Sequence, residues 1–218
     1  TIRAVVRGAG HYLPARVVEN AEFEATLDTT DDWIRSRSGI ERRHFATDTD
    51  TTSSMATAAA RAALSDSGLE ASDIDAIVLA TSSAALTFPS AATMVQAERG
   101  MTGGFAFDGQ AVGAGFVYAL SNANALILSG QARRVLVIGA ETFSKIMDWT
   151  DRSTCVLFGD GAGALVLEAQ DGMGDASDRG ILACDLNSDG RHRDLLYVDG
   201  GVSTGTSGYL RMQGNQVF

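Results

Sequence analysis

FAFDGQAVGAGFVYAL, from Phe105 to Leu120, joins a short apolar run to a longer one through a glycine-rich turn. This pattern predicts a buried strand that leads directly into a buried helix. A side chain at such a junction faces the positive end of the helix dipole, which lowers the pKa of a thiol. Free backbone N–H groups at the same place can hold an oxyanion. The turn has Gly113 there, and a glycine keeps only the backbone half of this arrangement.

Outward from this stretch, short β-rich runs alternate with helical runs. The alternation predicts an α/β fold in which helices cover a parallel sheet. Two helices are expected, over Thr51–Ser67 and from Pro89 to Gly100, because capping residues, a proline or a glycine stand at their ends. Strands are expected over Arg3–Gly8, Ala76–Thr81, Phe105–Asp108, Arg134–Gly139 and Gly163–Glu168.

The helix expected over Ala114–Ser129 has apolar residues on nearly every side. A helix without a water-facing stripe must be enclosed all round. The sequence therefore predicts protein layers on both faces of this helix. The long apolar window from Ala111 to Leu128 also contains Ser121, Asn122 and Asn124 and follows a strand without a linker, so it indicates a core helix and not a membrane span.

The chain has 218 residues, 45% of them hydrophobic, and a formal net charge of −10. Its field would repel nucleic acid and anionic membranes, which argues against both as partners. The most concentrated basic run is Arg35, Arg37, Arg42 and Arg43, and most of it is expected to be solvated. Two cysteines cannot form a disulfide scaffold or a four-ligand metal site, and the first residues lack a signal-peptide core, so a cytoplasmic location is expected.

The composition changes after Gln170, where DGMGDASDRG forms a polar connection. We expect one domain over 1–170 and the start of a second over 171–218, with strands at Ile181–Leu186 and Leu195–Val198. The final MQGNQVF has the pattern of the opening turn of a helix. The second half is therefore expected to be truncated.

Several segments together resemble the β-ketoacyl-acyl-carrier-protein synthase III family, a condensing-enzyme family of the thiolase-like superfamily. They are GHYLPARVVEN, DTTDDWIRSRSGIERRH, TFPSAA, FAFDGQAVGAGF, DRSTCVLFGDGAGALVLEA, LNSDG and MQGNQVF. The resemblance covers the whole chain. It implies a layered αβαβα thiolase-like fold of two similar halves, of which the N-terminal half is complete here, and a homodimer.

The resemblance also implies a reaction, the condensation of acetyl-CoA with malonyl-acyl-carrier-protein that starts fatty-acid synthesis. The family has a cysteine at the position of Gly113, which takes the acetyl group, and a His and an Asn of the second half that assist condensation. Neither partner is expected here, because His11, His44 and His192 lie outside the family's histidine motif. The chain as written is therefore predicted to be inactive in condensation. Acyl-CoA and acyl carrier protein are the implied partners, CoA thioester is a substrate, and no cofactor is implied.

Substrate binding is better preserved. The resemblance places the adenine of CoA between Trp33 and Arg152, with Arg37 near the phosphates or the pantetheine entrance. An indole face and a guanidinium both stack on a purine. Core packing is the alternative for Trp33. Phe88 resembles the residue that crosses the dimer interface to shape the acyl pocket, and a hydrophobic staple before Pro89 is its alternative. Further positions match the pantetheine channel, although plain core packing also fits them: Leu157, Phe158, Met212, Gly214 and Phe218.

Two cysteines remain as substitutes for the missing nucleophile. Cys155 stands between a polar turn and an apolar strand, which favours a small buried hydrophobic residue, and Cys184 is expected in a strand.

Three hypotheses of different classes stay open for the function of the chain. The chain is an incomplete synthase III altered at its nucleophile, a noncatalytic relative that binds acyl-CoA or modifies a partner subunit, or a nonfunctional fragment.

Overall fold

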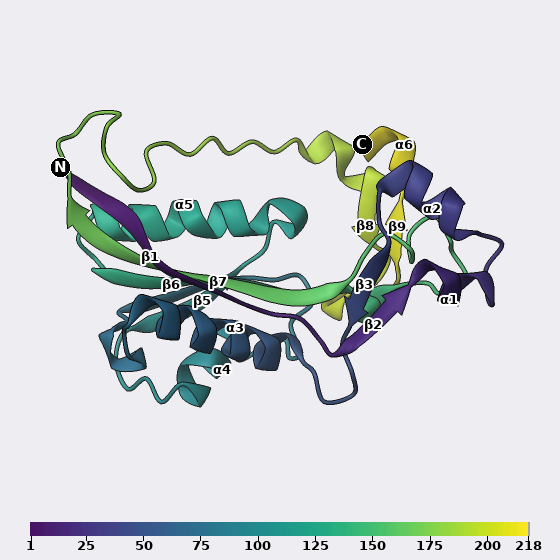
Figure 1. The fold of residues 1–218 in the computed structure, drawn as a ribbon, viewed down its shortest axis with the longest axis horizontal. Helices are drawn as coiled ribbons and strands as arrows, with labels where there is room; N and C mark the ends of the chain where they lie inside the picture. Colours follow the sequence, from purple (N-terminus) through teal and green to yellow (C-terminus); the bar gives the residue numbers. More distant parts are fainter. Residues whose placement is uncertain (218) are drawn as a thin grey trace. The chain divides into compact units, whose positions relative to one another are not determined.

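The computed structural model in Figure 1 describes residues 1–217 and divides into two compact units. Unit 1 comprises Thr1–Leu13, Asp50–Glu141 and Gly161–Leu186. Unit 2 comprises Pro14–Thr49, Thr142–Asp160 and the residues from Asn187 onward. Each unit therefore gathers segments from distant parts of the sequence. The boundary expected near residue 170 between two sequence halves stays a prediction.

Unit 1 is built on a five-stranded sheet in the order β1-β7-β6-β4-β5. β4 is parallel to both β5 and β6, whereas β1 is antiparallel to β7, so the sheet is mixed and not wholly parallel as expected. All five expected strands are present, several of them longer than expected. Their bounds are β1 Ile2–Tyr12, β4 Ala76–Ala80, β5 Phe105–Gly109, β6 Arg134–Thr142 and β7 Asp160–Asp171.

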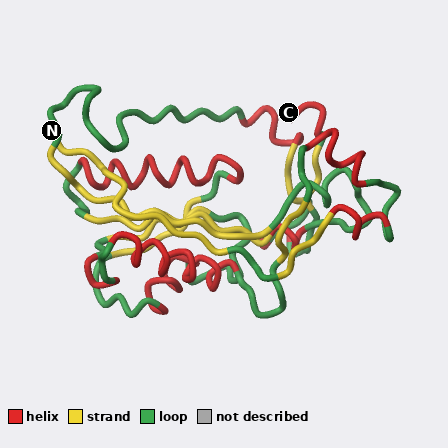
Figure 2. The backbone as a smooth tube through the Cα atoms, in the orientation of Figure 1, coloured by secondary structure: helices red, strands yellow, loops and turns green. Residues whose placement is uncertain are grey.

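Helices cover both faces of this sheet, as Figure 2 shows. α3 (Thr52–Ser67) and α4 (Ala91–Glu98) lie on one face and α5 (Gly115–Leu128) on the other. Alternation along β4 explains how one strand serves two cores. Ile77 and Leu79 pack with α3 and α4, and the intervening Val78 packs with α5.

Two glycines of β1 allow α3 to approach the sheet closely. A Cβ built on Gly8 would lie 2.5 Å from the backbone N of Ser67, and one built on Gly10 would lie 2.3 Å from the backbone N of Ala63. Real Cβ atoms do not approach backbone atoms so closely. The small residues Ala59 and Ala63 of α3 complete this contact and are fully buried.

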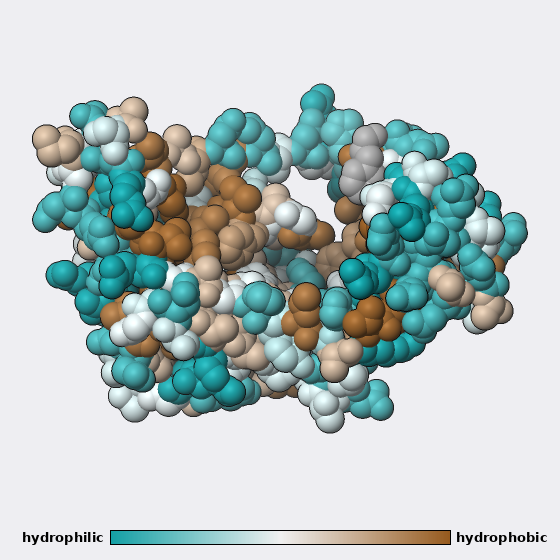
Figure 3. Space-filling view, in the orientation of Figure 1, coloured by the Kyte–Doolittle hydropathy of each residue, from teal (hydrophilic) through white to brown (hydrophobic). Residues whose placement is uncertain are grey.

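The expectation that α5 is enclosed on all sides is wrong for this structure. Ala119, Ala123 and Ile127 are buried against the sheet, but Val117 is 48% and Leu128 is 49% exposed. Figure 3 shows the resulting apolar surface over α5. The described residues supply one covering layer, the sheet of unit 1, and an all-round apolar helix needs two.

Unit 2 consists of short elements around a core of its own. β2 (Arg16–Glu19) pairs antiparallel with β3 (Arg42–Phe45), and β8 (Leu196–Val198) pairs antiparallel with β9 (Leu210–Met212). Its α-helices are α1 (Asn20–Glu24), α2 (Asp31–Ser38) and α6 (Gly214–Val217). The core residues are Val18, Phe23, Ile34, Phe45, Phe143, Met147, Cys155, Val156 and Leu210. The chain also has 3-10 turns at Ala71–Asp73, Val112–Ala114, Phe143–Ile146, Gly190–Leu195 and Val202–Thr204.

The strand expected over Ile181–Leu186 is absent, and this segment is an irregular, mostly exposed stretch. A strand needs a neighbouring strand to accept its ladder hydrogen bonds. The backbone N–H of Ile181 does donate to the carbonyl of Ala4. The second expected strand, Leu195–Val198, is present as β8, and the expected opening turn at the C-terminal end is present as α6.

Candidate functional site

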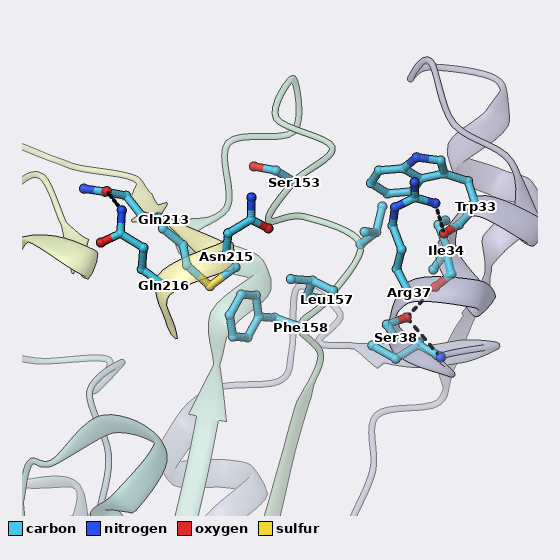
Figure 4. A pocket seen from close by; sticks show the side chains of 14 residues that line it. Trp33, Ile34, Arg37, Ser38, Ser153, Leu157, Phe158, Gln213, Asn215 and Gln216 are labelled. Carbon is cyan, nitrogen blue, oxygen red and sulfur yellow. Dashed lines mark hydrogen bonds between the residues drawn. The ribbon is translucent and has the colours of Figure 1, made fainter. Parts of the chain in front are cut away.

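A cavity of about 1000 Å³ lies within unit 2 (Figure 4). Three segments line it, and we name them by position. The α2 wall is Trp33, Ile34, Arg37, Ser38 and Ile40; the 153–158 wall is Ser153, Val156, Leu157 and Phe158; the 212–216 wall is Met212, Gln213, Gly214, Asn215 and Gln216. The volume is within the range of small-molecule and cofactor sites.

Local sequence fixes the α2 wall. The side chain of Thr30 accepts a hydrogen bond from the backbone N–H of Trp33 and caps the helix, and Gly39 ends it with a φ of 74°. Trp33 and Arg37 are four residues apart, so they lie on one side of the helix. The guanidinium carbon of Arg37 is 4.5 Å from the centroid of the Trp33 ring.

A second guanidinium meets the same indole from another segment. The guanidinium carbon of Arg152 is 4.8 Å from the Trp33 ring centroid, and Arg152 also donates to the backbone carbonyl of Asp28. Trp33 itself is half-buried and packs against the unit 2 core while lining the cavity. Core packing of Trp33 is therefore confirmed in part, and its stacking on adenine stays a prediction.

The other two walls are apolar with an amide edge. Phe158 packs against Phe143 with ring centroids 5.4 Å apart, and Leu157 lies beside it in Figure 4. Met212 and Gly214 face the cavity from β9 and α6. Of the channel positions expected from the resemblance, Phe218 lies outside the described residues.

Sequence reasoning did not single out Gln213, Asn215 and Gln216, whose amides line the same cavity. The polar pair that follows Gly214 in MQGNQVF was the available signal, because an amide side chain offers a ligand both donors and an acceptor. The side-chain amide of Gln216 donates to the side-chain oxygen of Gln213 at 3.1 Å.

The basic run is only partly solvated, because Arg43 is just 6% exposed. Its Nη2 donates to the side-chain oxygen of Asn20 and to the carbonyl of Val156, each at 2.8 Å, and its Nη1 donates to the carbonyl of Val18 at 3.3 Å. Burial lowers the pKa of this guanidinium from its ordinary value. Strand alternation in RRHF explains the difference, since Arg43 and Phe45 face inward while Arg42 faces out.

Gly113 and Phe88 belong to unit 1 and do not line this cavity. Gly113 is exposed within the 3-10 turn Val112–Ala114 that leads into α5, and a Cβ built on it would meet nothing within 4 Å. Val112 before it has a φ of 47°, which is rare for a β-branched residue. Phe88 is 83% exposed.

The remaining nucleophile and ligand candidates lie elsewhere. Cys155 is fully buried, as expected for a small hydrophobic residue, and burial raises the pKa of its thiol to about 11. Cys184 is exposed and lies outside any strand.

No group of three or more His, Cys, Asp or Glu within residues 1–217 could hold a metal ion. No helix of the same residues is long and apolar enough to cross a membrane.

Comparison with known proteins gives one consistent family. The family model of 3-oxoacyl-[acyl-carrier-protein (ACP)] synthase III matches residues 107–190. The chain is 80% identical over 218 residues to the β-ketoacyl-[acyl-carrier-protein] synthase III of Roseobacter denitrificans, covering all of this chain and 68% of the relative. It is 72% identical over 218 residues to a protein of the same name from Cereibacter sphaeroides, with the same coverage.

Solved structures agree with these relatives. The 3-oxoacyl-(acyl carrier protein) synthase III of Pseudomonas aeruginosa superposes with a TM-score of 0.90 at 45% identity, covering 99% of this chain and 65% of that one. The corresponding enzyme of Aquifex aeolicus gives 0.89 at 43% identity, covering 98% and 66%. The chain thus spans about two thirds of the length of the relatives it matches. Its fold is thiolase-like, and the chain belongs to the β-ketoacyl-[acyl-carrier-protein] synthase III family.

Proposed function

We propose that unit 2 binds an acyl-CoA in the cavity between the three walls, and that the chain as written does not carry out the condensation for which its family is named. The observation that carries the proposal is the Trp33 indole, which lines a cavity of about 1000 Å³ and has two guanidinium carbons within 5 Å of its ring centroid. Aromatic and guanidinium planes bind a purine, and guanidinium groups also bind phosphate.

The three walls suit different parts of CoA. Arg37 and Arg152 supply the positive charge that a 3′-phosphate and a diphosphate require, in a chain whose net charge is −10. Leu157 and Phe158 offer an apolar wall for the pantetheine arm, and the amides of the 212–216 wall offer partners for its two peptide-like groups. By the name of the family, an acyl carrier protein is the proposed binding partner.

Binding requires Arg152 to move. A purine between Trp33 and Arg152 needs about 3.5 Å on each side, whereas the guanidinium carbon lies 4.8 Å from the ring centroid. Arg152 is exposed and its ion pair with Asp28 is 3.4 Å long with an exposed carboxylate. Such a pair stabilises by about 0–1 kcal/mol, so adenine can displace it.

Chemistry supports the inactive part of the proposal. Thioester exchange needs a nucleophile that holds the acyl group between two half reactions, and Gly113 has none. Loss of a covalent nucleophile lowers rates on the order of a millionfold. Cys155 cannot take over, since a buried thiol with a pKa of about 11 is neutral at physiological pH.

Intact-mass analysis after incubation with acetyl-CoA tests this proposal on the unaltered chain and on Gly113→Cys. The unaltered chain should gain no acetyl group, while Gly113→Cys should gain one, because the Cβ has free space and α5 begins just beyond it. Gly109→Cys is the matched control, since its Cβ is equally free but stands at the end of β5. Acetylation of the unaltered chain would overturn the inactive assignment.

Calorimetry with CoA tests the binding part separately. The unaltered chain should bind CoA without acyl transfer, and Trp33→Ala should weaken binding by about tenfold or more, as loss of a stacking side chain typically does. Equal affinity of Trp33→Ala and the unaltered chain would refute the assignment of the cavity. Arg42→Ala, an exposed change in the same unit outside the lining, serves as the control.

A further inference from the structure

The buried Arg43 links two walls of the cavity. Its Nη2 donates to the backbone carbonyl of Val156, which lines the 153–158 wall, at 2.8 Å. The same nitrogen donates to the side-chain oxygen of Asn20 at 2.8 Å. Neither Arg43 nor Asn20 lines the cavity itself.

Asn20 continues the connection to the α2 wall. Its amide nitrogen donates to Oδ1 of Asp31 at 2.8 Å and to the backbone carbonyl of Ile40 at 2.7 Å. Asp31 begins α2, and Ile40 is a lining residue just beyond its C-terminal cap. Both ends of the helix that carries Trp33 and Arg37 are therefore tied to one asparagine.

The energetics of this cluster are unusual for a structural arginine. Arg43 is 6% exposed, and no carboxylate lies within ion-pair distance of it among residues 1–217, although the charge of Glu22 acts to raise its pKa. Backbone carbonyls, one amide oxygen and the ring of Phe23, whose centroid lies 4.8 Å from the guanidinium carbon, compensate its charge. Its Nε is buried without a hydrogen-bond partner. A hydrophobic residue would avoid this desolvation penalty, but it could not tie two carbonyl groups of separate segments together.

We propose that Arg43 and Asn20 are positioning residues that hold the α2 wall at a fixed separation from the 153–158 wall. This inference rests on the proposed function, because the separation matters for a ligand that spans both walls. In CoA the nucleotide end meets Trp33 and Arg37, and the pantetheine arm meets Leu157 and Phe158. Each end alone binds to one wall and does not sense their separation, whereas the intact molecule does.

The test compares three probes: CoA, adenosine 3′,5′-bisphosphate and pantetheine. Asn20→Asp keeps the shape of the side chain and the acceptor for Arg43 but removes the two amide donations to Asp31 and Ile40. It should weaken CoA binding by about tenfold, because only the intact molecule spans both walls, and leave each fragment within about twofold. Arg43→Lys loses the planar guanidinium that donates to both Asn20 and Val156, and it should weaken CoA binding in the same way. Arg42→Lys, the exposed neighbour on β3, is the matched control and should bind all three probes as the unaltered chain does.

A merely structural role gives a different result. Equal losses for CoA and for both fragments, or no loss for CoA, would overturn the proposal. Should either variant fail to fold, hydrogen exchange on the unaltered chain decides the matter. CoA should then slow exchange of the backbone amides of Asn20 and Arg43, and protection confined to the lining residues would contradict the link.

Failure of the proposed function is distinguishable from failure of this inference. If the unaltered chain binds none of the three probes, the cavity assignment is wrong. The role of Arg43 is then tested without a ligand. Arg43→Lys should speed amide exchange of Cys155 and Leu157 relative to Arg42→Lys, because the hydrogen bonds of these two amides lie in the wall that Arg43 holds. Unchanged exchange would refute the link by itself.

Discussion

At the scale of single residues, burial decides what Cys155 can do. The thiol is fully buried, and desolvation first and the carboxylate of Asp151 second raise its pKa to about 11. A thiolate is the reactive form of cysteine, and a raised pKa depletes it at neutral pH. Gly113 presents the opposite case, since its position is open to solvent but it has no side chain.

Alkylation should therefore separate the two cysteines. At about pH 8, iodoacetamide should modify the exposed Cys184 and spare Cys155, because only a small fraction of a thiol with a raised pKa is ionised and the group is inaccessible. Peptide mass mapping measures both sites. Denaturant should expose both cysteines, and equal modification under native conditions would contradict the burial of Cys155.

At the scale of elements, the packing of α3 on β1 depends on residues without side-chain bulk. Gly8 and Gly10 face Ala63 and Ser67, and a Cβ on either glycine would overlap the helix backbone. Alternation places both glycines on the same face of β1. The close approach of α3 to β1 therefore depends on the two glycines of RGAG, which are two residues apart.

Gly10→Ala should destabilise the fold, because its Cβ would lie 2.3 Å from the backbone N of Ala63. Overpacking of this kind typically costs about 1–3 kcal/mol. Urea unfolding measures the change. Gly163→Ala on β7 is the matched control, since its Cβ meets nothing within 4 Å and its stability should change by less than about 1 kcal/mol. Equal urea midpoints for Gly10→Ala and Gly163→Ala would show that the close approach of α3 to β1 does not limit stability.

In unit 2, Arg211 of β9 connects the β8–β9 ribbon to the turn at Asp148. Its Nη1 is 2.9 Å from Asp148 and its Nε is 2.7 Å from Asp199. The hydroxyl and backbone N–H of Thr150, and then Arg211, lower the pKa of Asp148; Arg211 and then the backbone N–H of Tyr209 lower that of Asp199. The ribbon that ends in the 212–216 wall is therefore held partly by ionised carboxylates.

The pH dependence follows from these directions. A carboxyl group whose pKa is lowered by folding stabilises the fold above its unfolded value of 3.8, and this contribution is lost as pH falls through the folded pKa. Amide exchange in β9 should therefore speed up as pH falls from about 5 to about 2, after correction for intrinsic rates. Asp148→Asn should show faster exchange already at the higher pH and a smaller further change. The exposed Asp48→Asn should follow the unaltered chain.

At the scale of the whole molecule, apolar side chains of several elements are exposed in the described part of the chain. α5 exposes Val117 and Leu128, the edge strand β5 exposes Phe105 and Phe107, and Phe88 is 83% exposed. An edge strand has unpaired N–H and C=O groups that can pair with another chain. We propose that a second copy covers β5 and Phe88 in a homodimer, as the family resemblance implies.

Sedimentation at several concentrations tests this dimer. The unaltered chain should be dimeric, and Phe88→Ala should weaken the dimer by about tenfold or more, since central aromatic residues carry much of the energy of an interface. Met173→Ala is the control, because Met173 is also apolar and 84% exposed. A monomer at every concentration would contradict the proposal. Loss of cooperative unfolding in that monomer would favour the hypothesis of a nonfunctional fragment.

Short-range patterns predicted much of this protein. Alternation and apolar runs gave all five strands of unit 1, and capping residues gave the ends of α3, because these signals depend on near neighbours in sequence. The segment Ile181–Leu186 was predicted wrongly, since a strand exists only where a partner strand lies beside it. The absence of a nucleophile at position 113 needs no structure at all.

Only tertiary structure decided which side chains meet. Trp33 and Arg152 are far apart in sequence and come within 4.8 Å because their segments share one core. Arg43 looked like part of a solvated basic run, and folding buries it between Asn20 and Val156. The sequence by itself determined the strands and helices of unit 1, the family resemblance and the missing thiol, since each is local in the chain. The cavity and the polar link behind it depend on contacts between distant segments, which no local pattern specifies.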